Sequence, residues 1–122
     1  MHSEPADPAF APVLRALRET CAAEALTCVG FSNYPPSDDR VFAAAGVPTV
    51  SIGFQDRAGV HQLWLALNAR GAGLAPGFTP EIFGLLHSGA DTLERLDPAT
   101  LERAASAYVE IIRRLDAALP VS

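Results

Sequence analysis

The sequence contains no lysine, only two cysteines and a single tryptophan among 122 residues. It also lacks a long hydrophobic run, so it offers no candidate for a membrane-spanning helix. The nine basic residues are all arginines and are scattered along the chain, which argues against a nucleic-acid-binding surface. The first residues show no basic segment followed by an apolar one, so we expect no signal peptide and a cytoplasmic location.

Cys21 and Cys28 are too few for a disulfide framework, and a zinc knuckle would need a second pair. Free cysteine generally behaves as a small buried hydrophobic residue. We therefore expect both cysteines to be reduced residues of the core, which is consistent with a cytosolic protein.

The composition is that of a folded domain. Hydrophobic residues make up 49% of the chain and charged residues 19%, which excludes intrinsic disorder. The length suits one domain, and the net charge is −5. Residues 1–8 are rich in proline and acids and predict a flexible tail. Residues 9–122 then form a single domain.

Helical periodicity is clearest at the two ends of this domain. Apolar residues recur on one face over residues 9–24. The last helix is predicted over residues 98–119, with Asp97 as its N-cap and Pro98 in its first position. Its apolar stripe, which we expect to face the core, consists of Leu101, Ala105, Tyr108, Ile112, Leu115 and Leu119.

Short apolar runs between these helices predict strands over residues 26–31 and 48–54. Ser37 resembles the N-cap of a helix over residues 38–45, which Gly46 would end. The order of these elements predicts an α/β fold: a small layered domain whose short mixed or parallel sheet is covered by the N-terminal helix and the long C-terminal helix.

The stretch between the second strand and the last helix is less clear. Residues 55–60 predict a polar turn, and residues 61–69 fit either a helix or a third strand. Residues 70–79 are rich in glycine, alanine and proline and predict a loop. A short apolar segment over 80–86 is followed by a polar, turn-like segment over 87–96.

His87 is the most informative polar residue because it leaves an apolar segment and enters a glycine-containing loop. A neutral imidazole there could hold a metal, or it could be an ordinary hydrogen-bonded residue. Asp91 could orient the His87 ring or simply close a turn. Asp38 could take part in acid–base chemistry or stabilise a helix start. No nucleophile elbow, phosphate-binding loop or H-E-x-x-H pair is present.

Two segments resemble motifs of the zinc aminopeptidases of clan MH, a group that includes glutaminyl cyclases. Residues 37–53 read S-D-D-R-V-F-A-A-A-G-V-P-T-V-S-I-G and resemble S-D-H-x-x-F-x-x-x-G-[IV]-P-x-[VL]-x-[IVLF]. Residues 87–98 read H-S-G-A-D-T-L-E-R-L-D-P and resemble H-T-x-x-D-T-x-x-x-[LI]-D. Both motifs occur in the family's order, and the resemblance covers residues 9–119.

The resemblance implies roles for individual residues. His87 corresponds to the family's last zinc ligand, and Asp91 to the acid that follows it in the same loop. Asp38 corresponds to an acid near the active site, so Asp38 and Asp91 are the catalytic candidates. Phe78 and Leu86 are the candidates for substrate binding.

The chain also departs from the family. Asp39 stands where the family usually has histidine, and Ser88 replaces the usual threonine. Leu86 stands where several members have a tyrosine that stabilises the transition state. The family's other metal ligands and its glutamate general base belong to an N-terminal half, and residues 1–36 contain no counterpart.

The resemblance therefore implies a truncated or split zinc-dependent hydrolase of peptide or amide bonds that is not active alone. Its zinc site would need a complementing N-terminal half, because a catalytic zinc ion normally has three protein ligands. The alternative is a non-catalytic α/β module derived from the same family, which binds a partner or forms a homodimer through its exposed strand edge and apolar helix face.

Overall fold

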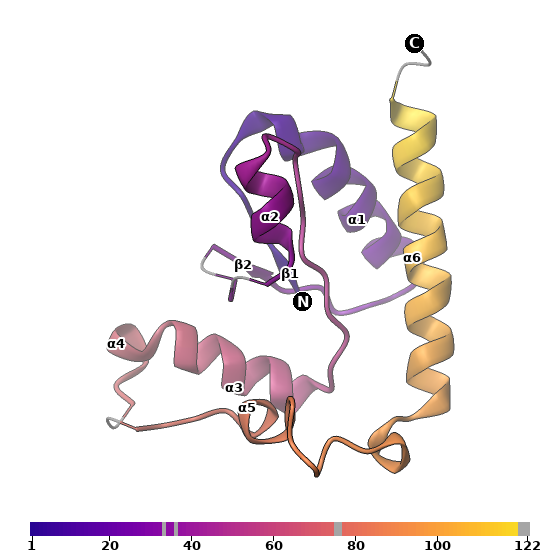
Figure 1. The fold of residues 1–122 in the computed structure, drawn as a ribbon. Coiled ribbons are helices and arrows are strands. Elements are labelled where there is room, and N and C mark those ends of the chain that lie inside the picture. Colours follow the sequence, from indigo (N-terminus) through magenta and orange to yellow (C-terminus); the bar gives the residue numbers. More distant parts are fainter. Residues whose placement is uncertain (33, 36, 75–76, 120–122) are drawn as a thin grey trace.

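The structure is a computed structural model that describes residues 1–32, 34–35, 37–74 and 77–119, and it is rich in helix (Figure 1). Two short strands, β1 (His2–Ser3) and β2 (Gly30–Phe31), pair in parallel. The helices are α1 (Ala11–Ala23), α2 (Asp39–Ala44), α3 (Arg57–Leu67), α4 (Ala69–Ala72), α5 (Glu81–Leu85) and α6 (Pro98–Ala118), with 3-10 turns η1 (Pro8–Phe10) and η2 (Leu93–Arg95). A mixed α/β class is thus confirmed in outline. Within these ranges no helix has the length and apolar character needed to cross a bilayer.

The first residues of the chain form the centre of the small sheet. His2 donates its backbone N–H to Val29 at 3.0 Å, and Ser3 donates to Ser51 at 2.9 Å. The His2 side chain is only 4% exposed. The prediction of a flexible tail over residues 1–8 is therefore wrong for residues 1–4, which lie between the two segments that were expected to be strands.

Those two segments form less strand than their sequences predict. Residues 26–31 contribute only β2, and residues 48–54 contribute only an antiparallel bridge between Ile52 and His2. A strand exists only where a neighbour completes its hydrogen bonds. Because β1 has two residues, its neighbours are paired over that length alone.

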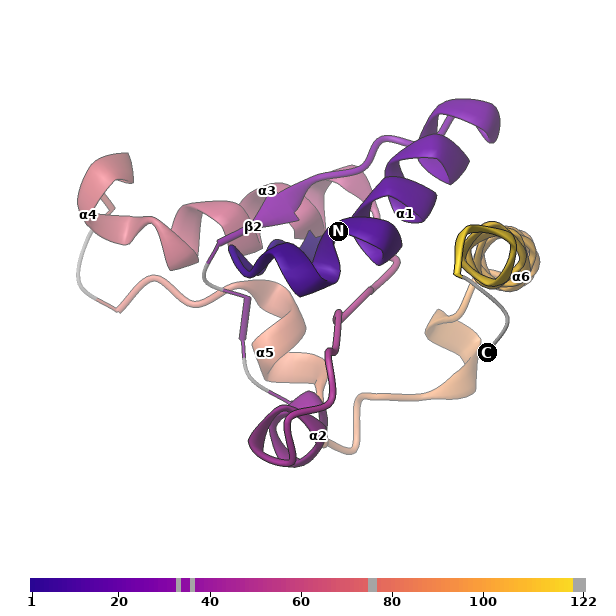
Figure 2. The same cartoon turned by 90° about the horizontal axis from the view of Figure 1, so that it is seen from above.

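The core lies where α1 crosses α6, and Figures 1 and 2 both show these helices side by side. Ala16 and Leu17 of α1 are buried against Ile111 of α6. Thr20 is also fully buried, and its hydroxyl donates to the Ala16 carbonyl at 2.9 Å. This bond allows a polar side chain to lie in the core without an unsatisfied hydroxyl.

Helix α6 begins as the sequence predicts. Asp97 is its N-cap, and the Asp97 carboxylate accepts hydrogen bonds from the backbone N–H groups of Ala99 and Thr100. Pro98 occupies the first turn, where its missing N–H costs nothing. These hydrogen bonds lower the pKa of Asp97, the bond from the Thr100 hydroxyl contributing most.

The buried face of α6, however, differs from the predicted stripe. Ala107 and Ile111 are buried against α1, whereas Leu101 and Ile112 are 50% and 65% exposed. Leu115 is the stripe residue that packs against the core cluster. The helix has apolar residues on two adjacent faces, and the position of α1 determines which face is buried.

The region after the second predicted strand is helical. Asp56 caps α3 by accepting from the backbone N–H of Gly59, so the helix starts inside the segment predicted as a polar turn. Residues 61–69 therefore lie in α3 and at the start of α4, and they form no third strand. Residue 81 begins the short helix α5. Helix α4 starts at Ala69 and extends into the predicted loop over residues 70–79, of which residues 75–76 lie outside the described residues.

Helix α2 lies within the predicted range, but its start differs. Ser37 does not cap it; instead the Ser37 backbone N–H donates to the Asp39 carboxylate at 2.8 Å. Gly46 follows the helix with φ of 77°, a left-handed conformation that glycine adopts without strain.

Cys21 and Cys28 form a disulfide, with 6.1 Å between their Cα atoms. Ala25, in the left-handed region with φ of 50°, reverses the chain between them. The prediction of two reduced core cysteines is therefore wrong. Disulfides are rare in the cytosol, so the cytoplasmic location loses the support that free thiols gave it.

Candidate functional site

His87 lies directly after α5, and its side chain is exposed. Its backbone is in the left-handed region, with φ of 59°. This conformation costs an L-residue about 1–2 kcal/mol, although histidine adopts it more often than most residues. Strained positions of this kind concentrate at functional sites, which draws attention to the His87 side chain.

A cavity of about 340 Å³ brings the two motif segments together, and we call it the His87 cavity. Leu86 and His87 line it from the end of α5, and Ser37 lines it from the start of the other motif. Most of the other lining residues are apolar, including Phe31, Leu63 and Ile82. Ser37 and His87, which are distant in the sequence, thus border the same space.

Tyr34 also lines the His87 cavity, from the loop after β2, and no motif in the sequence selects it. Burial raises the pKa of the Tyr34 phenol above its usual value, and the charges of Tyr108 and Asp39 raise it further. The phenol is therefore protonated at neutral pH and can donate a hydrogen bond inside the cavity. No sequence signal marks Tyr34 as a cavity residue, because tyrosine in a proline-flanked loop is common.

The other predicted site residues lie apart from the cavity lining. Asp38 is exposed next to Ser37, and Phe78 is exposed in the loop before α5. Asp91 is exposed in a turn, where its backbone N–H donates to the Ser88 carbonyl at 3.2 Å. No hydrogen bond joins Asp91 to His87 among the residues that the structure describes. The structure therefore agrees with Asp91 as a turn residue. That Asp91 orients the His87 ring stays a prediction.

The residues present do not by themselves fit a zinc site. Over the described ranges there is no group of three or more histidine, cysteine, aspartate or glutamate side chains that could hold a metal ion. The two cysteines are joined to each other and so offer no thiolate. A zinc ion at His87 would need ligands from other polypeptide segments.

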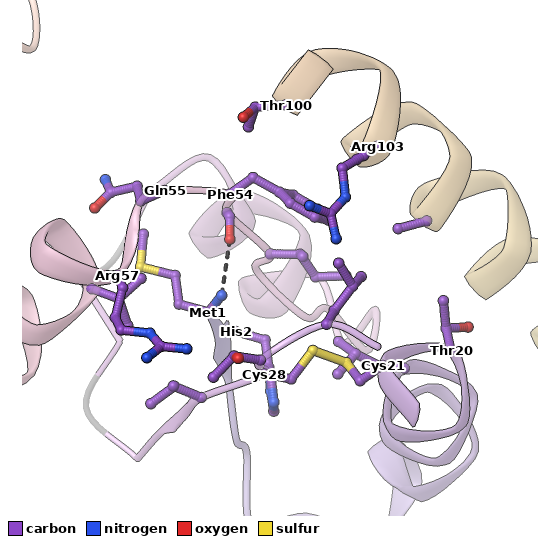
Figure 3. Close-up of a pocket in the computed structure, with 18 of the residues that line it drawn as sticks. Met1, His2, Thr20, Cys21, Cys28, Phe54, Gln55, Arg57, Thr100 and Arg103 are labelled. Carbon is purple, nitrogen blue, oxygen red and sulfur yellow. Dashed lines mark hydrogen bonds between the residues drawn. A yellow bond between two sulfur atoms is a disulfide. The ribbon is translucent and has the colours of Figure 1, made fainter. Parts of the chain in front are cut away.

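A second and larger cavity, of about 500 Å³, lies between α1, α3 and α6 (Figure 3). We call it the central cavity. The Cys21–Cys28 disulfide and the buried His2 form part of its wall. Arg57 lines it from the start of α3, and Arg103 lines it from α6. Sequence reasoning missed this cavity because its lining comes from six separate segments, the N-terminus included.

Comparison with family models, with curated proteins and with solved structures finds no match to this chain. The candidate site therefore rests on the residues and geometry described above.

Proposed function

We propose that the chain forms the substrate-cavity part of a zinc aminopeptidase-like hydrolase and does not cleave a peptide or amide bond by itself. The observation that carries the proposal is the shared cavity. Ser37, at the start of one motif, and His87, at the start of the other, line the same space of about 340 Å³. If the two motif resemblances were coincidental, there would be no reason to expect both segments at one cavity.

The backbone of His87 supports the same proposal. Its left-handed conformation would favour glycine or asparagine if the position served only to end α5. A histidine there presents an exposed imidazole at the cavity, which is consistent with selection for a ligand. Leu86 and the neighbouring Phe83 supply the apolar surface that would contact a substrate side chain.

The other parts of such an enzyme would come from outside these 122 residues. In the described chain His87 has no metal-binding companions, and nothing near it is placed as a general base. We therefore propose that the remaining ligands and the base are supplied by another polypeptide segment. Asp38 follows Ser37 in the chain and is exposed, so it could meet such a segment.

A two-ligand binding experiment tests this proposal. The uncleaved dipeptide Leu-Leu is titrated into the chain with and without zinc and followed by amide NMR shifts. Dipeptide shifts should centre on Phe83, Leu86 and His87, and zinc should leave the affinity unchanged, because His87 alone does not hold the ion. Leu86→Asp should weaken dipeptide binding by about tenfold or more, because it places a charge in the apolar lining. No hydrolysis of leucine p-nitroanilide is expected from the chain alone.

Leu93→Asp is the matched control, because Leu93 is an exposed leucine that does not line the His87 cavity. It should retain the dipeptide affinity of the native chain. The proposal fails if the dipeptide causes no shifts centred on the His87 cavity. It also fails if the two leucine variants lose affinity equally, since the dipeptide would then bind away from the cavity.

The exposed face of α6 favours a second candidate function, a homodimerisation module. Leu101, Ala105, Tyr108 and Ile112 recur at steps of four and three, the spacing of a coiled-coil seam. Leu101 is 50% and Ile112 65% exposed, whereas Tyr108 contacts Phe54 and donates its hydroxyl to the Ile52 carbonyl. The seam is therefore open at Leu101 and Ile112. A second copy of α6 would cover it with the same surface, as two-fold symmetry requires.

Sedimentation equilibrium tests the dimer. The native chain should approach about twice its 12.9 kDa mass as its concentration rises. The double variant Leu101→Glu/Ile112→Glu should remain monomeric, because it places two charges on the seam. Val41→Glu makes the same change on exposed α2 and should not alter the mass. A native chain that is monomeric at every concentration would exclude this function.

A further inference from the structure

The central cavity has the size of a small-molecule site. Its volume is about 500 Å³, within the range of 300–1,000 Å³ that is typical of ligand pockets. It is bordered by the N-terminal residues Met1 and His2, α1, the loop that contains Cys28, the segment around Ile52, α3 and α6. Because six segments border it, the cavity exists only in the folded chain.

Most of the cavity wall is apolar. Leu17 and Ile111 reach it from the core between α1 and α6, and Val60 and Trp64 line it from α3. The disulfide adds a further uncharged surface (Figure 3). Such a wall favours binding of an apolar ligand, because burying the apolar surface of the ligand away from water lowers the free energy.

The charge of the cavity is opposite to that of the whole chain. The sequence has 14 acidic and 9 basic residues, yet none of the described residues that line the cavity is aspartate or glutamate. Two arginines, Arg57 and Arg103, do line it and lie on different sides of it (Figure 3). Neither makes an ion pair within the described ranges, whereas Arg18, Arg113 and Arg114 all do.

We propose that the central cavity binds a small amphipathic carboxylate, a molecule with an apolar body and one anionic head group. The apolar wall would hold the body, and Arg57 or Arg103 would bind the carboxylate, for which the planar guanidinium is well suited. A cationic amphiphile of the same length would face two positive charges and no carboxylate. His87 does not line the central cavity, and this proposal does not depend on the proposed hydrolase function.

The fluorescence of Trp64, the only tryptophan, reports on this cavity directly. The probe is decanoate, titrated below its micelle concentration at 0.15 M salt, with decyltrimethylammonium as the cation of equal chain length. Decanoate should saturate the signal and bind at least about tenfold more tightly than the cation. Arg57→Gln or Arg103→Gln should weaken decanoate binding by about tenfold, the effect of one charge-assisted hydrogen bond.

Arg40→Gln is the matched control, because Arg40 is exposed on α2 and lines neither cavity. It should leave decanoate affinity unchanged. The proposal is overturned if decanoate fails to saturate, if the cation binds equally well, or if Arg40→Gln causes the same loss. Amide shifts on decanoate addition should centre on Val60, Trp64 and Ile111, and shifts centred instead on the exposed residue Ile112 would also overturn it.

Discussion

Cys28→Ser is expected to lower the free energy of unfolding by about 2.5 kcal/mol, because it removes the crosslink to Cys21. The disulfide closes a loop with a sequence separation of 7 residues, which restricts the unfolded chain more than the folded one. Cys28 is exposed, so its replacement by serine removes little buried surface. Urea denaturation of the native and variant chains, with the slope of unfolding compared, measures the change.

The reduced native chain is the control for this prediction. In the presence of a reductant its stability should fall to that of Cys28→Ser, because both then lack the same bond. The variant itself should not respond to the reductant. Thiol titration of the unfolded, oxidised native chain should find no free thiol. Two free thiols, or a stability that the reductant leaves unchanged, would contradict the disulfide.

The cysteines illustrate why sequence reasoning reached only part of this fold. Elements with local signals were correctly predicted, such as the Asp97 cap of α6 and the end of α2 before Gly46. The disulfide depends on a chain reversal at Ala25, and alanine is not a usual residue for φ of 50°. A residue count could not reveal that the two thiols meet.

The strands failed for a related reason. Apolar alternation over residues 48–54 predicts a strand but says nothing about its partner. In the structure the partner is the two-residue β1, which comes from a segment whose prolines and acids predicted a tail. Strand length is a property of a pair of segments, so neither sequence alone can determine it.

Some residues that line the two cavities were selected from the sequence, and others were missed. Motif spacing selected Leu86 and His87, and both line one cavity with Ser37. Motif spacing could not find Tyr34, because its position there depends on how the loop after β2 packs. The arginines of the central cavity were also missed, since scattered basic residues gave no pattern until the fold placed two of them around one space.

Ile111→Ala is expected to lower the free energy of unfolding by about 2–4 kcal/mol, through lost burial and the cavity left beside Leu17. Ile111 is 7% exposed in the core, whereas the adjacent Ile112 is 65% exposed. Ile112→Ala removes the same atoms and should change stability by less than about 0.5 kcal/mol. Chemical denaturation at concentrations below any self-association compares the two variants.

This pair of variants tests the rotation of α6 about its own axis. Periodicity alone placed Ile112 in the buried stripe, and the packing of α1 places Ile111 there instead. Because successive residues point about 100° apart on a helix, the two arrangements predict opposite rankings of the variants. A larger loss for Ile112→Ala would mean that α6 presents its seam to the core, and both the α1 contact and the exposed dimerisation face would then be wrong.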